Sequence, residues 1–186
     1  MYTYVVLFVS RNKDNAGVEG FKPRTHSFLT HDPETCYDSF RKFVDEGVKG
    51  ETSRFYVSVS ERDMDKTRKA LACHLVMHDD VDLTKMEALV ASFAMRPEHE
   101  MTKKWLFDFD CTDYDLKEQF ADELEQATKC PVYDYHTPHG FAVVAMHGFN
   151  SRDFLPLWNK KLKEKNPNWS VELKRNAMLL KDWATK

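Results

Sequence analysis

The pattern of hydrophobic and polar positions predicts a chain in which helices alternate with strands. Runs rich in aromatic and β-branched residues predict strands, and apolar residues spaced three and four apart predict helices. The expected strands cover residues 2–9, 26–30, 54–60, 103–110, 131–135, 140–146, 169–173 and 177–181. The expected helices cover residues 32–46, 63–78, 83–95, 113–124 and 151–164. This order favours an α+β fold, in which helices pack on a largely antiparallel sheet.

Length and composition predict one α+β domain spanning residues 1–186, because the chain has 42% hydrophobic and 13% aromatic residues. Within it we expect an N-terminal strand and helix unit at 1–50 and a core at 51–186, with a helical segment at 62–96. The net charge of −3 argues against a surface coated in basic residues.

Several features predict a cytoplasmic protein without membrane contact. The sequence contains no apolar run of the roughly 20 residues that a membrane span needs, and its first residues lack the pattern of a signal peptide. The four cysteines are scattered without a C-x-x-C pair, which predicts free thiols in a reducing compartment. The oligomeric state is left open by the sequence.

The strand at 103–110 carries the clearest sign of chemistry, because its apolar run ends in two aspartates one residue apart. Residues i and i+2 of a strand point to the same face, so Asp108 and Asp110 should stand side by side, with Phe107 and Phe109 on the opposite face. Two carboxylates that close repel each other unless a cation lies between them. Divalent ions such as Mg²⁺ take oxygen ligands of this kind.

A site with two metal ions needs a further carboxylate. Asp182 is the best candidate, because it follows the apolar strand 177–181 in the way that the first pair follows its strand. Asp134 and Asp153 are alternatives, and Asp153 fits the start of a helix better.

Groups that suit phosphates lie elsewhere in the chain. The turn before strand 140–146 contains His139, a potential donor, and Gly140, which lets a backbone approach a ligand closely. Arg54 and Lys181 could supply positive charge for a triphosphate, together with Arg62, Lys174 and Arg175.

The ordered set of motifs resembles the archaeo-eukaryotic primase superfamily, including its small stand-alone members in phage genomes. The family's first motif, a hydrophobic strand ending in D-x-D, matches residues 105–110, and its third, a hydrophobic residue followed by Asp, matches 180–182 loosely. Residues 53–59 look like an upstream strand of the small phage proteins, and the resemblance covers about residues 50–186.

The resemblance implies an RRM-like, primase-like core and a nucleotidyltransferase that acts on nucleoside triphosphates and DNA or RNA. Asp108, Asp110 and Asp182 would be its catalytic residues and its ligands for Mg²⁺ or Mn²⁺. His139, Gly140, Arg54 and Lys181 would bind the substrate.

One departure from the family concerns its second motif, which places a histidine on the strand just after the glycine turn. Here Gly140 and Phe141 are followed by Ala142, so His139 or His147 would have to substitute. Alternatively, the protein keeps the fold and the metal site without synthesising primers.

Three other hypotheses remain open. The same residues would also serve phosphodiester hydrolysis. A non-catalytic, phage-type module would bind a nucleotide, a nucleic acid or a host protein, with Tyr133, Tyr135 and Phe141 stacking on bases. In an unrelated α+β fold, Asp108 and Asp110 would be turn residues.

Overall fold

The computed structural model describes residues 2–186 and divides them into two compact units. Unit 1 comprises the described residues up to Met101 together with Leu180–Lys186, and unit 2 comprises Thr102–Leu179. Each unit contains one four-stranded sheet.

Unit 1 is built on a sheet with the strand order β2-β1-β3-β8, in which β1 runs antiparallel to both of its neighbours. At the far edge the side chains of Thr52 and Thr185 hydrogen-bond at 2.8 Å, where β3 begins and β8 ends. The elements are β1 (Tyr4–Ser10), η1 (Asn12–Asp14), β2 (Arg24–Thr30), η2 (Pro33–Cys36), α1 (Tyr37–Asp45), β3 (Thr52–Ser58), α2 (Met64–Met77), η3 (Leu83–Lys85), α3 (Met86–Ala94), η4 (Pro97–His99) and β8 (Met178–Thr185).

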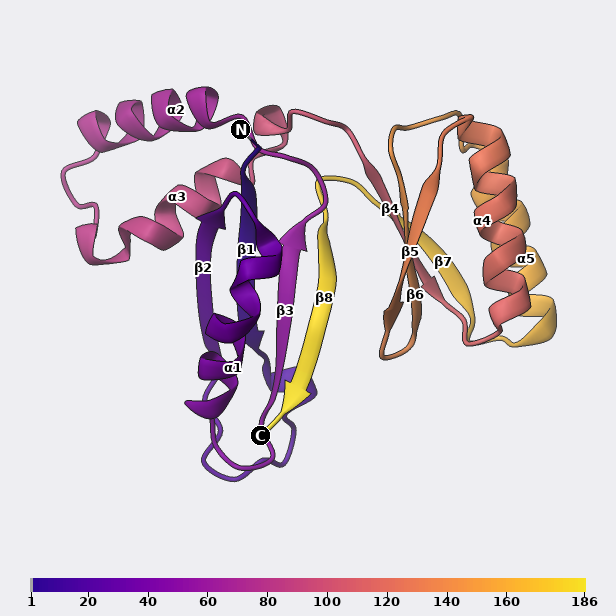
Figure 1. Ribbon diagram of the computed structural model, residues 1–186, viewed down its shortest axis with the longest axis horizontal. Coiled ribbons are helices and arrows are strands. Elements are labelled where there is room, and N and C mark those ends of the chain that lie inside the picture. The colour runs from indigo at the N-terminus through magenta and orange to yellow at the C-terminus, as the bar shows by residue number, and fades with distance from the viewer. Residues whose placement is uncertain (1) are drawn as a thin grey trace. The chain divides into compact units, whose positions relative to one another are not determined.

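The core of unit 1 lies between the sheet and α1, which covers it in Figure 1. Phe8 of β1 and Phe55 of β3 pack on Phe40 of α1, with ring centroids 5.1–5.6 Å apart. The expected start of this helical segment is confirmed, because Asp32 accepts a hydrogen bond from the Glu34 N–H at 3.0 Å. Helix α3 contacts β1 and β2, and α2 packs against α3.

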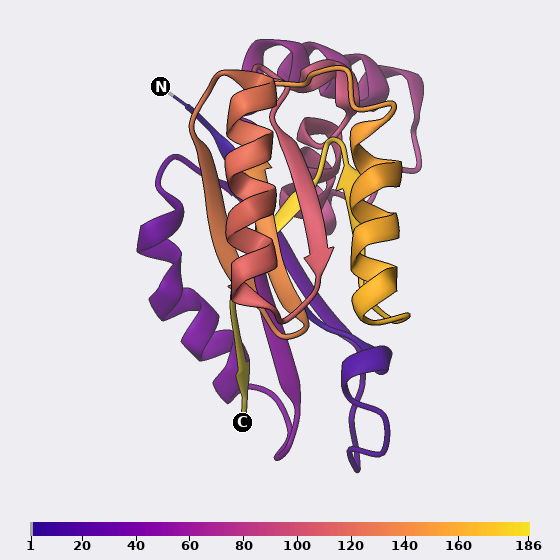
Figure 2. The same ribbon diagram turned by 90° about the vertical axis from the view of Figure 1, so that its right-hand side faces the viewer.

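Unit 2 has the element order β-α-β-β-α-β and the antiparallel strand order β5-β6-β4-β7. This is the ferredoxin-like arrangement of elements. Figure 2 shows its two helices side by side over one face of the sheet. The elements are β4 (Trp105–Asp110), α4 (Tyr114–Thr128), β5 (Val132–Thr137), β6 (Gly140–Ala145), α5 (Phe154–Lys165) and β7 (Ser170–Lys174).

The core of unit 2 lies between the sheet and its helices, and β4 supplies its centre. Phe107 and Phe109 are fully buried and pack on Phe120 of α4 at 5.5 and 4.9 Å between ring centroids. Trp158 of α5 completes the cluster at 5.2 Å from Phe120. Asp113 caps helix α4 by accepting the Leu116 N–H at 3.1 Å, so the helix begins at Tyr114, one residue after the expected start at 113.

The α+β class predicted from the sequence is confirmed, with two antiparallel sheets in place of one. The units also divide the chain at positions other than the expected boundary after residue 50. Pairing of β1 with β3 joins the first 50 residues to those that follow. None of the helices within residues 2–186 is both long and apolar enough to cross a membrane.

Candidate functional site

The aspartate pair of β4 lies on the face of the unit 2 sheet that points away from α4 and α5. Phe107 and Phe109 occupy the helix-covered face, so the two-residue period places Asp108 and Asp110 together on the other face, as the sequence predicts. In the strand register, Asp108 pairs with Ala142 of β6 on one side and with Glu172 of β7 on the other. The structure therefore confirms that the two aspartates share a face, and it places their strand between two others in the sheet.

The charges on this face are only partly balanced. The Lys174 ammonium donates a hydrogen bond to Asp108. Partial burial of the Asp110 carboxyl group, and then the negative charge of Asp108, raise the pKa of Asp110, and the charges of Lys174 and His139 oppose this rise. Burial by itself would lower the pKa of Lys174, but the hydrogen bond to Asp108 and the nearby carboxylates raise it overall. Burial and the neighbouring carboxylate therefore favour the neutral form of Asp110 relative to a free aspartate.

His139 and His147, which the sequence analysis named as possible substitutes for a primase histidine, lie at opposite ends of β6. His139 lies in the turn before β6, at the end of the sheet where Asp110 lies, and its charge influences the pKa of Asp110. His147 follows the opposite end of β6, and its Nε2 lies 3.0 Å from the sulfur of Cys130. Of the two, only His139 lies at the end of the sheet that carries Asp110.

Gly140 has a structural role that the sequence did not indicate. A Cβ atom on this residue would lie 2.2 Å from the carbonyl oxygen of Phe109 and 2.8 Å from the backbone nitrogen of Cys111. The close approach that Gly140 permits is therefore an approach of β6 to the end of β4. Its contact with a substrate stays a prediction.

Three of the predicted site residues belong to unit 1. Arg54 donates to Asp14 at 2.6 Å, and Lys181 donates to Glu34 at 2.8 Å. Asp182 lies inside β8, since that strand continues to Thr185 rather than ending at residue 181 as expected. The contacts described for these residues all lie within unit 1, and their part in a site with Asp108 stays a prediction.

Glu172 is the acidic residue of this face that the sequence analysis missed. Its place opposite Asp108 depends on pairing of β4 with β7, and its side chain is 73% exposed. Asp134 instead accepts from Lys117 of α4 at 2.9 Å, and Asp153 precedes the first residue of α5. Among residues 2–186, no group of three or more His, Cys, Asp or Glu side chains is close enough together to hold a metal ion.

Aromatic residues of the edge strand β5 share the face with the aspartates. Tyr133 pairs with Val144, and Tyr135 pairs with Ala142, the neighbour of Asp108. Phe141, by contrast, belongs to the hydrophobic core with 5% exposure. Of the three aromatic residues proposed to stack on bases, Tyr133 and Tyr135 therefore lie on the face that carries the aspartates, and Phe141 does not.

Comparison of the chain with models of protein families, with curated proteins and with solved structures finds no match. Its function must therefore be inferred from its residues and their geometry.

Proposed function

We propose that the helix-free face of unit 2 binds a divalent cation together with a nucleoside triphosphate, as in a nucleotidyltransferase of primase type that acts on nucleic acid. The observation that carries this proposal is the pair formed by Asp108 and Asp110 on one face of the central strand β4. The raised pKa of Asp110 reflects an unfavourable negative charge that a bound cation would relieve.

The residues on this face fit Mg²⁺ or Mn²⁺ bound with a substrate. Mg²⁺ is commonly held by one or two carboxylates, with waters and substrate phosphates completing its shell. Asp108 and Asp110 would supply those carboxylates. When bound, such an ion supplies positive charge that stabilises the negative charge developing in phosphoryl transfer.

The neighbouring cations fit the phosphates. Lys174 is paired with Asp108, so replacement of its ammonium by a divalent ion would free it to contact a phosphate oxygen. His139, at the Asp110 end of the sheet, can donate a hydrogen bond to a phosphate oxygen as well. Asp182, Arg54 and Lys181 belong to unit 1, so the proposal for this face rests on the residues of unit 2.

A second candidate function is a binding module without catalysis, whose partner is a nucleotide, a nucleic acid or a host protein. Two observations favour it. Ala142, at the position where primases carry a histidine, pairs with Asp108, so no imidazole is present on β6 beside the aspartate pair. Lys174 already provides Asp108 with a positive charge. Tyr133 and Tyr135 would then contribute by stacking on bases.

Calorimetric titration of Mn²⁺, with and without a non-hydrolysable nucleoside triphosphate, tests the proposal on wild type, Asp108→Asn and Asp110→Asn. The matched control is Asp122→Asn, which changes an exposed carboxylate on α4. We expect Mn²⁺ binding that tightens with triphosphate, is lost in the two β4 variants and persists in the control.

Primer synthesis on a single-stranded template separates the two candidate functions. Synthesis by wild type that Asp110→Asn abolishes supports the enzyme. Binding of triphosphate without synthesis supports the module, and absence of Mn²⁺ binding by wild type contradicts the metal site.

A further inference from the structure

A pocket in unit 1 lies between β2 and α1, above the buried ring of Phe8. Its volume is about 430 Å³, and its lining includes Phe8, Arg24, His26, Lys42, Phe43 and Glu46. Pockets of 300–1,000 Å³ that combine aromatic walls with a few polar groups are typical of small-molecule sites. All of its lining comes from unit 1, so it is separate from the face described above.

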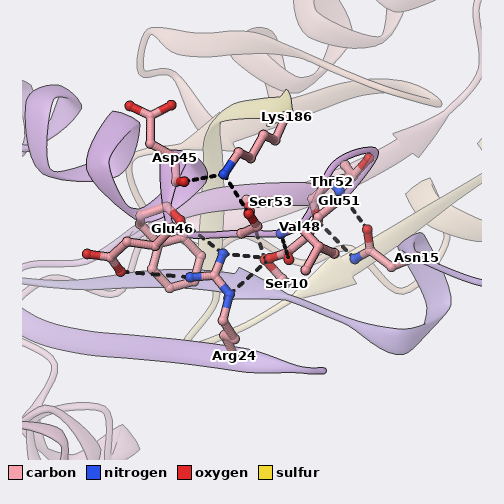
Figure 3. Close-up of polar contacts among 12 residues, drawn as sticks. Ser10, Asn15, Arg24, Asp45, Glu46, Val48, Glu51, Thr52, Ser53 and Lys186 are labelled. Atoms are coloured by element: carbon pink, nitrogen blue, oxygen red, sulfur yellow. Dashed lines mark hydrogen bonds and ion pairs between the residues drawn. The ribbon is translucent and has the colours of Figure 1, made fainter. Parts of the chain in front are cut away.

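Arg24 lines one side of this pocket and is held by the polar contacts drawn in Figure 3. Its Nε and Nη2 donate to the same oxygen of Glu51 at 3.0 and 2.6 Å, and Nη2 also donates to the carbonyl of Phe43 at 2.9 Å. The guanidinium lies 4.2 Å from the centre of the Phe43 ring. Glu51 is 2% exposed and accepts the Val48 N–H at 3.0 Å, so the anchor is itself fixed.

One end of the Arg24 fork remains available to a ligand. Within residues 2–186, Nη1 makes no hydrogen bond, and the carboxylate nearest to it is Glu46 at 3.9 Å. The Glu46 side chain is 73% exposed and can therefore rotate away.

A lysine and a histidine border the same space. Lys42 projects from α1 and His26 from β2, and both are exposed. The His26 ring lies 5.0 Å from the Phe28 ring and 6.1 Å from the Phe8 ring, so it extends the aromatic wall. A ligand here would meet a fixed planar guanidinium, a mobile ammonium and the exposed ring of His26, since Phe8 and Phe43 are buried.

We infer that this pocket is a binding site for a small phosphate monoester that carries a flat ring, the chemical class of nucleoside monophosphates. A planar guanidinium recognises phosphate oxygens with directed hydrogen bonds, and Lys42 adds a flexible point charge. The exposed His26 ring offers a flat surface on which the ring of the ligand can stack. The phosphate takes the place beside Nη1 that Glu46 now borders.

Opposite effects of two neighbouring charges, Lys42 on α1 and Glu46 directly after it, provide the test. Calorimetry with adenosine monophosphate should show weaker binding to Lys42→Gln, by about tenfold, which is the effect of losing one charge-assisted hydrogen bond. Glu46→Gln should bind more tightly than wild type, because the competing carboxylate is removed. Lys69→Gln, an exposed change on α2 outside the pocket, is the matched control and should bind as wild type does.

Ribose 5-phosphate and inorganic phosphate complete the experiment. The inference requires that both bind more weakly than adenosine monophosphate, since they lack the ring. Equal binding of inorganic phosphate, equal loss in Lys69→Gln, or no binding to wild type at millimolar concentration would each overturn it. Asp108→Asn should leave this binding unchanged, so the result is independent of the function proposed for unit 2.

Discussion

Gly140→Ala tests whether the glycine of the β5–β6 turn serves the fold or a ligand. The added Cβ would lie 2.2 Å from the Phe109 carbonyl oxygen and 2.8 Å from the backbone of Cys111, whereas real Cβ contacts below 3.0 Å essentially never occur. Both neighbours are backbone atoms, so the overlap cannot be relieved by rotating a side chain. Strand β6 would have to move away from β4 at the end that carries Asp110.

The expected cost is about 3 kcal/mol, the upper end of the range for overpacking a fixed core. For a unit of this size it corresponds to a melting temperature lower by about 12–24 °C. Urea unfolding is followed by far-ultraviolet circular dichroism, which reports on both units, and by tryptophan fluorescence, which reports mainly on unit 2 because that unit contains Trp105, Trp158 and Trp169.

Gly20→Ala is the matched control, because it makes the same chemical change where nothing lies within 4 Å. Its φ of +71° still disfavours alanine, so a cost of about 1 kcal/mol is expected from conformation alone. If Gly140→Ala unfolds at the wild-type urea concentration but no longer binds nucleotide, the steric argument is wrong and Gly140 acts on the ligand.

Three further predictions concern single side chains. The pKa of Asp110 is raised in the folded state, so the stability of the fold falls as pH rises from 3.8 through the raised pKa. Urea unfolding at pH 7 should therefore show Asp110→Asn to be more stable than wild type. A gain in stability that persists below pH 3.8 would contradict this cause. Phe120→Ala removes a fully buried ring from the unit 2 core and should cost about 3–5 kcal/mol, so a loss below 1 kcal/mol in the same assay would contradict the packing described. Burial and the hydrogen bond to Glu61 raise the pKa of Tyr4 to about 12, so the stability that Tyr4 contributes is complete below pH 10.0 and is lost as pH rises through about 12. In an ultraviolet titration of the tyrosines, Tyr4→Phe should remove the ionisation that occurs at the highest pH. An unchanged titration would refute the assignment.

Local patterns in the sequence were sufficient to identify most of the helices and strands. The Asp-Pro pair at 32–33 marks the start of a helical segment, and the apolar run at 105–109 forms a strand with its phenylalanines in the core. The shared face of Asp108 and Asp110 also follows from the sequence, because it depends only on the two-residue period of a strand.

Long-range pairing decided what the sequence left open. The split into two sheets depends on β1 pairing with β3 and on β8 joining β3, contacts between residues far apart in the chain. Sequence pattern alone does not specify such partners, because any amphipathic strand can satisfy the same periodicity. For this reason Asp182 was expected to end a strand, whereas it lies inside one that belongs to the unit 1 sheet.

The surroundings of the aspartate pair were likewise set by strand register. Ala142 and Glu172 lie beside Asp108 because β6 and β7 flank β4 in one particular alignment, and a shift of one residue would turn both to the other face. The sequence by itself determined which residues can carry the chemistry and which face of their strand they share. Only the tertiary structure decided their neighbours, because register and sheet order arise from contacts between segments and not within them.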